Sequence, residues 1–96
     1  AFINKENNLL DFSLFNVYPN PFNPITNIQF STSSNSFIEI FVYDIKGRQI
    51  YSLRENRQIS GQQSIQINGS QWETGIYFLE LKKGKNRLIK KIMLIK

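Results

Sequence analysis

Basic side chains are concentrated at the end of this chain, where they could steer or bind an acidic partner. Residues 82–96 contain seven lysines and arginines and no acid, whereas residues 1–81 contain five basic and seven acidic residues, a net charge of −2. An edge strand whose lysines discourage sheet-to-sheet aggregation would explain this segment, and so would a nucleic-acid surface. The lysines alternate with aliphatic rather than aromatic residues, so no base-stacking platform accompanies them. We therefore favour the edge strand and expect no nucleic-acid partner.

Catalytic chemistry has few candidate residues. The chain has no histidine and no cysteine, which excludes a Ser-His-Asp triad, a thiolate zinc site and a disulfide. The seven carboxylates are scattered, and each glycine stands alone, so no acid–base pair and no phosphate-binding loop is indicated. We predict that the chain is not an enzyme, and we assign no catalytic, cofactor-binding or metal-ligating residue.

Length and composition indicate one globular domain. The chain has 96 residues, of which 41% are hydrophobic and 20% charged. A domain of this size can form a hydrophobic core without disulfides or a structural metal. No run approaches the roughly 18 apolar residues that would span a bilayer, so we expect no membrane insertion. Residues 1–13 have only weak periodicity and carry no signal-peptide pattern. We expect a linker at residues 1–16, a domain at residues 17–96, and a longer parent protein with any signal peptide further upstream.

Short strands separated by turns dominate the rest of the chain. Residues 25–31 alternate with Thr26, Ile28 and Phe30 on one face, and residues 36–44 place Ile38 and Val42 on one face. Glycines spaced 6 to 14 residues apart fit turns between such strands. With further strands at residues 14–17, 48–53, 64–68, 75–82 and 87–96, the pattern predicts an all-β, immunoglobulin-like antiparallel β-sandwich of about seven strands. Residues 87–96 alternate imperfectly, and we expect a bulge around Lys90–Lys91 to repair the pattern.

The aromatic residues are explained mainly by structural roles, although one group of them could bind a sugar. The segment QWETGIY at residues 71–77 matches a tyrosine corner, in which the Tyr77 hydroxyl bonds back to the upstream backbone, and Trp72 takes the packed corner position. Phe37, Phe41 and Tyr43 share one strand face. They could form a platform for a sugar, although packing in the core or against a partner domain is the simpler explanation.

All three prolines lie in the segment YPNPFNP at residues 18–24. Each proline fixes its own φ and biases the preceding residue toward extended geometry, so the segment cannot be a central strand. We expect an edge segment or a crossing between sheets, anchored to the core by Tyr18 and Phe22, with the asparagines capping turns.

The order of these motifs resembles a known family. YPNPFNP (18–24), ITNIQFS (25–31), FVYDIKGRQI (41–50), TGIYFLEL (74–81) and KKIMLIK (90–96) follow one another as in the type A C-terminal sorting domain of type IX secretion. Carried over by position, the resemblance implies recognition by the export machinery through the PNP motif, the turn glycine, the Gly-x-Tyr motif and the terminal basic signal. The matching residues are Pro19, Asn20, Pro21, Gly47, Gly75, Tyr77, Lys90, Lys91 and Lys96.

The resemblance implies a transport signal rather than a catalyst. Such a domain directs an attached upstream cargo protein from the periplasm of a Gram-negative bacterium through the type IX translocon. A sortase-like peptidase then removes the domain, by a cut in or before residues 1–16, and the cargo is secreted or anchored at the cell surface. Two alternatives stay open: an immunoglobulin-like adhesion or carbohydrate-binding module, and the related immunoglobulin-like domain of flagellar hook-capping scaffold proteins, which the segments PNPFNP and YDIKGR also resemble.

Overall fold

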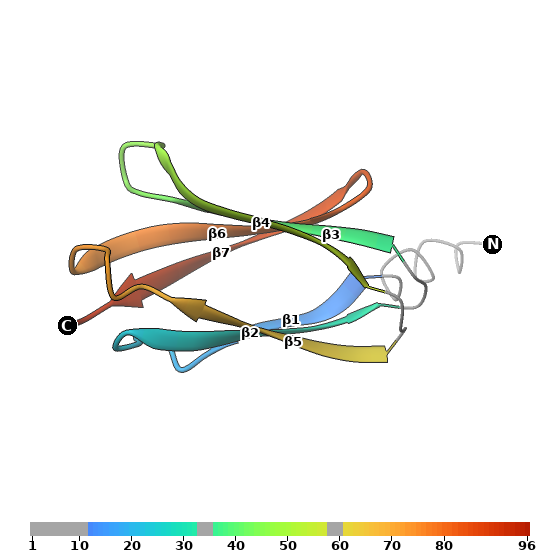
Figure 1. The fold of residues 1–96 in the computed structure, drawn as a ribbon, viewed down its shortest axis with the longest axis horizontal. Coiled ribbons are helices and arrows are strands. Elements are labelled where there is room, and N and C mark those ends of the chain that lie inside the picture. Colours follow the sequence, from blue (N-terminus) through green and yellow to red (C-terminus); the bar gives the residue numbers. More distant parts are fainter. Residues whose placement is uncertain (1–11, 33–35, 58–60) are drawn as a thin grey trace.

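Seven strands form two antiparallel sheets packed face to face (Figure 1). The computed structural model describes residues 12–32, 36–57 and 61–96. The strands are β1 (Phe12–Tyr18), β2 (Ile25–Thr32), β3 (Ser36–Tyr43), β4 (Gln49–Arg57), β5 (Gly61–Asn68), β6 (Gly75–Lys83) and β7 (Asn86–Leu94). The three-stranded sheet has the order β1-β2-β5 and the four-stranded sheet the order β4-β3-β6-β7. The predicted all-β sandwich of seven strands is confirmed, and β1 crosses the predicted boundary at residue 17.

Side-chain alternation in the strands builds the core between the sheets. Thr26, Ile28 and Phe30 of β2 are buried, as the sequence pattern predicts, and they face the buried residues of β3 and β6. Sheets packed in this way interdigitate their inner side chains across about 10 Å. The buried apolar residues are Val17, Phe22, Ile28, Phe30, Ile38, Ile40, Val42, Ile65, Ile67, Tyr77, Leu79, Leu81, Ile92 and Leu94.

The last strand alternates without the predicted bulge. Its pairing with β6 is continuous from Gly75 opposite Leu94 to Lys83 opposite Asn86, so the bulge at Lys90–Lys91 is wrong. Ile92 and Leu94 point into the core and Lys90, half-buried, occupies the same face, where a lysine can bury its stem and keep its charged end in water. Ile89 and Met93 face outward instead, which is why neither alternate set of residues is wholly apolar.

The chain returns to one end of the sandwich three times before it finishes there. The β1–β2 connection, the β3–β4 turn, the β5–β6 connection and the C-terminus all lie at the left end in Figure 1, whereas β1 begins at the right. We call this left end the motif end. It comprises residues 19–24, 44–48, 69–74 and 91–96, and it brings together most of the sequence motifs.

Candidate functional site

The proline segment fastens the free edge of β7. The Phe22 amide donates to the Met93 carbonyl at 2.9 Å, and the Ile95 amide donates to the Phe22 carbonyl at 2.9 Å. Phe22 and Leu94 thereby form a parallel bridge. The Asn20 side chain extends the contact, since its Nδ2 donates to the Lys91 carbonyl at 3.2 Å and its Oδ1 accepts from the Met93 amide at 3.0 Å. One amide side chain thus replaces a strand residue at the sheet edge.

The side chain of Phe22 anchors the proline segment, whereas Tyr18 does not. Phe22 is 1% exposed and Tyr18 is 68% exposed, so the predicted anchor at Tyr18 is wrong. Strand alternation explains the difference, because Val17 of β1 points inward and its neighbour must point out. Pro19 contributes through its carbonyl, which accepts from the buried Thr26 hydroxyl at 2.7 Å. Pro21 is exposed, and all three X–Pro peptide bonds are cis.

An aromatic cluster around Trp72 joins the proline segment to the core. The ring centroids of Phe22, Tyr51 and Tyr77 lie 6.5, 6.1 and 5.3 Å from that of Trp72, in tilted or edge-to-face orientations that aromatic pairs favour. Gly69 allows the close approach: a Cβ there would lie 2.9 Å from Cε3 of Trp72. Gly69 also begins a turn, in which the Trp72 amide donates to the Gly69 carbonyl at 2.9 Å, and this turn lies in the connection between β5 of one sheet and β6 of the other.

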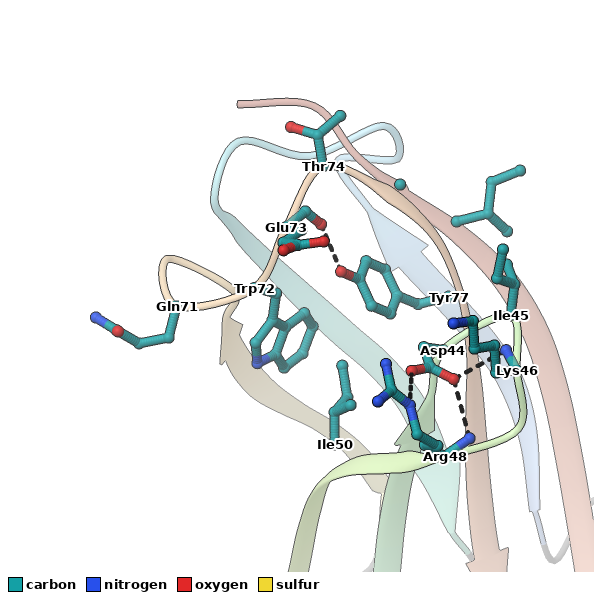
Figure 2. A pocket seen from close by; sticks show the side chains of 12 residues that line it. Asp44, Ile45, Lys46, Arg48, Ile50, Gln71, Trp72, Glu73, Thr74 and Tyr77 are labelled. Atoms are coloured by element: carbon teal, nitrogen blue, oxygen red, sulfur yellow. Dashed lines mark hydrogen bonds and ion pairs between the residues drawn. The ribbon is translucent and has the colours of Figure 1, made fainter.

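The tyrosine corner is present at the start of β6, as predicted. The Tyr77 hydroxyl donates to the Glu73 carbonyl (Figure 2). Burial raises the pKa of this hydroxyl, and the nearby carboxylates of Glu73 and Asp44 raise it further. Because the neutral hydroxyl is the hydrogen-bond donor, Tyr77 has a structural role in this end of the sandwich. Gly75, also predicted as a site residue, pairs with Leu94 at the first position of β6.

The β3–β4 turn is organised by one carboxylate. Asp44 accepts hydrogen bonds from the amides of Lys46 and Arg48, both at 2.9 Å, and from Nε of Arg48 at 2.8 Å (Figure 2). The Gly47 amide closes the turn by donating to the Asp44 carbonyl at 2.9 Å. Gly47 has a φ of 85°, a conformation that favours glycine.

A pocket of about 490 Å³ lies between the β3–β4 turn and the tyrosine corner (Figure 2). Its lining includes Ile50, Trp72 and Tyr77 together with the turn residues Asp44 and Arg48. The Asp44 carboxylate and the Tyr77 hydroxyl are engaged in the bonds described above. Each of these two polar groups therefore stabilises the turn to which it belongs, and among the described residues no cluster of His, Cys, Asp or Glu could hold a metal ion.

The three lysines of the predicted terminal signal occupy different environments. Lys96 is bound within the motif end: its Nζ donates to the carbonyls of Ser70 and Trp72 at 2.9 and 2.8 Å, and its amide to the Thr74 hydroxyl at 3.1 Å. Lys91 is exposed on the outer side of the four-stranded sheet, opposite Phe78, and Lys90 is half-buried on the inner side. The structure brings together Asn20, Gly75, Tyr77 and Lys96, whereas the side chain of Lys91 is exposed on the surface.

The Asp44 turn predicts a dependence of stability on pH. The hydrogen bond from the Arg48 amide lowers the pKa of Asp44 below its ordinary value of 3.8, against an opposing effect of burial. A lowered pKa contributes stability that is present above pH 3.8 and is lost as the pH falls through the lowered value. Asp44→Asn should therefore lower the thermal midpoint at pH 7, and the difference from the parent should shrink below pH 3.8. Denaturation scans from pH 7 to 2 test this, and a difference that stays constant would contradict it.

The fold and the motif end define a small all-β module that secures its own C-terminal strand. The chain belongs to the secretion system C-terminal sorting domain family, whose model matches residues 16–96. This confirms the predicted membership of the type IX sorting domains, and it implies export to the cell surface or release from the cell. No helix in the described ranges is long and apolar enough to cross a membrane.

Comparison with solved structures adds a likeness in fold. The crystal structure of dimeric latent PorU from Porphyromonas gingivalis matches with a TM-score of 0.65 and 15% sequence identity. The match covers 84% of this chain and 9% of PorU, so it concerns a small part of that protein. No curated protein sequence matches at a significant level.

Proposed function

We propose that this domain directs an attached upstream protein across the outer membrane through the type IX translocon. The observation that carries the proposal is the family match over residues 16–96. A sortase-like peptidase then cuts in or before residues 1–16, and the cargo is released or anchored at the cell surface. The seven-stranded fold supports a signal that is read in the folded state, because the family motifs come together only when the sandwich has formed.

The polarity of the fold supports this role. β1 begins at the end of the sandwich opposite the motif end (Figure 1). A cargo domain joined upstream of β1 would therefore leave the module at the far end from residues 91–96. The C-terminal strand and the motif end would stay accessible beside even a large cargo, as a signal for a translocon requires.

We assign recognition chiefly to β7 and its exposed lysine. A basic edge strand offers backbone groups for strand addition and charge for steering to an acidic receptor. Asn20 and Phe22 already form hydrogen bonds with the edge of β7 from Lys91 onward. The outward backbone groups of Arg87 and Ile89 are paired with no strand among the described residues. We therefore assign strand addition to these two residues. Asn20, Gly47, Gly75, Tyr77 and Lys96 then act by holding the motif end in shape.

Transfer of the domain to a passenger tests the proposed function. A passenger protein with a periplasmic signal peptide and this chain at its C-terminus should appear outside cells that have the type IX route. The same passenger without the chain should remain in the periplasm. Cell fractionation and immunoblotting measure the distribution, and periplasmic retention of the complete fusion would overturn the proposal.

Two single substitutions distinguish the proposed recognition role of Lys91 from the structural role of Lys96. Lys91→Glu should lower export several-fold with an unchanged thermal midpoint, because the Lys91 side chain is exposed and steering depends on charge. Lys96→Ala should lower the midpoint, since the Lys96 ammonium donates two hydrogen bonds worth about 1 kcal/mol each. Export assays paired with thermal denaturation distinguish the two effects. Normal export of the Lys91→Glu variant would show that Lys91 has no part in recognition.

A further inference from the structure

The outer face of the four-stranded sheet exposes apolar side chains from three neighbouring strands. Strand alternation directs them outward, and β3, β6 and β7 lie side by side in the sheet. Phe37, Phe78, Ile89 and Met93 are 52, 38, 54 and 37% exposed. Soluble monomers rarely gather such residues on one face unless the face binds something. The outer face is made of Phe37, Phe41, Tyr43, Phe78, Ile89 and Met93.

A hollow in the outer face has the size of a binding pocket. It has a volume of about 440 Å³ and is lined by Tyr43, Phe78, Glu80, Arg87 and Ile89. The nearly buried Glu80 accepts from the Tyr43 hydroxyl at 3.2 Å and pairs with Nε of Arg87 at 3.0 Å. These polar groups satisfy one another, so Phe78 and Ile89 are left to contact an inserted group. The hollow thus suits an apolar side chain, the usual anchor of a protein interface.

The charges around the outer face favour a protein partner that carries carboxylates. Four basic side chains and two carboxylates lie on this side of the sheet, and both carboxylates are already in ion pairs, so the face has a net charge of +2. Two copies of this face would repel each other. The residues concerned are Arg54, Lys82, Arg87 and Lys91, with Glu39 and Glu80.

Two aromatic rings of the outer face, those of Phe37 and Phe41, each have a cation over one ring face. The Arg54 guanidinium lies 4.7 Å from the centroid of the Phe37 ring, and the Lys82 ammonium lies 5.8 Å from that of Phe41. A sugar that stacks on either of these two rings would have to displace the cation from the ring face. The same cations can turn to a carboxylate from a partner. The predicted sharing of one strand face by Phe37, Phe41 and Tyr43 is confirmed, and the face lies outside the core.

We propose that the outer face docks on a protein of the export machinery, one that inserts an apolar side chain into the hollow and presents carboxylates to Lys82 and Lys91. This inference rests on the proposed function and adds to it a surface beyond the edge of β7. Ile89 belongs to both, because its outward backbone groups lie at the open part of the strand edge and its side chain lines the hollow. One partner can therefore add a strand at the edge and cover the face together.

Export of the passenger fusion tests the docking face with matched controls. Phe78→Ser combined with Ile89→Ser should lower export at least ten-fold, whereas Tyr18→Ser, at a more exposed aromatic residue of the other sheet, should leave export unchanged. Lys82→Glu should lower export several-fold, and Lys46→Glu, on the β3–β4 turn, should not. Thermal denaturation verifies that each variant folds. If the double variant fails to fold, Lys82→Glu and the crosslinking experiment below decide.

Crosslinking identifies the occupant of the face. A benzophenone-bearing residue at position 89 of the otherwise unchanged fusion should form an adduct with an outer-membrane component of the type IX machinery. An adduct with the passenger or with a second copy of this chain would overturn the docking proposal. Parent-level export by both folded face variants would overturn it as well, with the proposed function intact. Retention of the parent fusion in the periplasm would instead overturn the proposed function itself.

Discussion

Replacing Phe22 with alanine should lower the free energy of unfolding by about 3–5 kcal/mol, the range for truncating a buried phenylalanine. Phe22 is 1% exposed, packs edge-to-face on Trp72, and sits between the two sheets at the motif end. Its loss leaves a cavity beside a cluster of rings that cannot collapse without moving Gly69. In a domain of this size each kcal/mol shifts the thermal midpoint by about 4–8 °C. Urea denaturation followed by tryptophan fluorescence measures the change directly at Trp72.

Two controls isolate the contribution of the ring. Phe22→Leu keeps an apolar side chain and both backbone hydrogen bonds to β7, and it should cost less than the alanine variant because the cavity is smaller. Tyr18→Ala removes an aromatic side chain four residues earlier, but that side chain is 68% exposed and its loss should cost within about 0.5 kcal/mol. A Phe22→Ala variant as stable as Tyr18→Ala would show that the proline segment is not an anchor.

Ending the chain after Lys90 should unfold the domain. The missing residues include Ile92 and Leu94, which are 1 and 0% exposed, and truncating either to alanine would cost about 2–5 kcal/mol. The truncation also removes the hydrogen bonds that Asn20 and Phe22 make to β7. Together these losses reach the total stability of a typical domain, about 5–15 kcal/mol. Far-ultraviolet circular dichroism and thermal scans should show no cooperative transition.

A shorter truncation provides the matched comparison. Ending the chain after Leu94 keeps the buried residues of β7 and removes only Ile95 and Lys96, which are exposed and contribute hydrogen bonds to Phe22, Ser70, Trp72 and Thr74. This variant should fold with a lowered midpoint. The two truncations together show whether loss of export reflects an unfolded domain or a lost recognition group. Cooperative unfolding of the chain that ends at Lys90 would contradict the structural role of β7.

Alternation along the strands made the core predictable from sequence. A strand directs successive side chains to opposite faces, so Ile28 and Phe30 in β2, and Ile65 and Ile67 in β5, could be assigned to the interior without a structure. The tyrosine corner was equally predictable, because the Tyr77 hydroxyl and its acceptor Glu73 lie four residues apart. Both features depend on local spacing, which a sequence displays directly.

Contacts between distant segments could not be predicted in this way. Asn20 and its partners in β7 lie 71 and 73 residues apart, and an exposed asparagine between prolines gives no sign that its amide will bind a strand edge. In the sequence Lys96 is like the other terminal lysines, and only the structure shows that its ammonium binds carbonyl groups of the β5–β6 connection. The side chains that β7 directs outward could not be identified from sequence either. Ile89 and Met93 are exposed, but as apolar residues they suggest core positions, and a bulge would be needed to turn them inward.

The contact between residues 20–22 and β7 also fixes when, during synthesis, the domain can become complete. Residues 20–22 and the last strand of the domain contact each other, so Ile92 and Leu94 can fill the interior only after all of residues 20–94 have been synthesised. Pairing over such a sequence separation forms late, since the intervening loop must first be closed at a cost in entropy. A chain that stops before β7 would lack these core residues and the contact with residues 20–22, so a sorting signal that is read in the folded state would be absent from it.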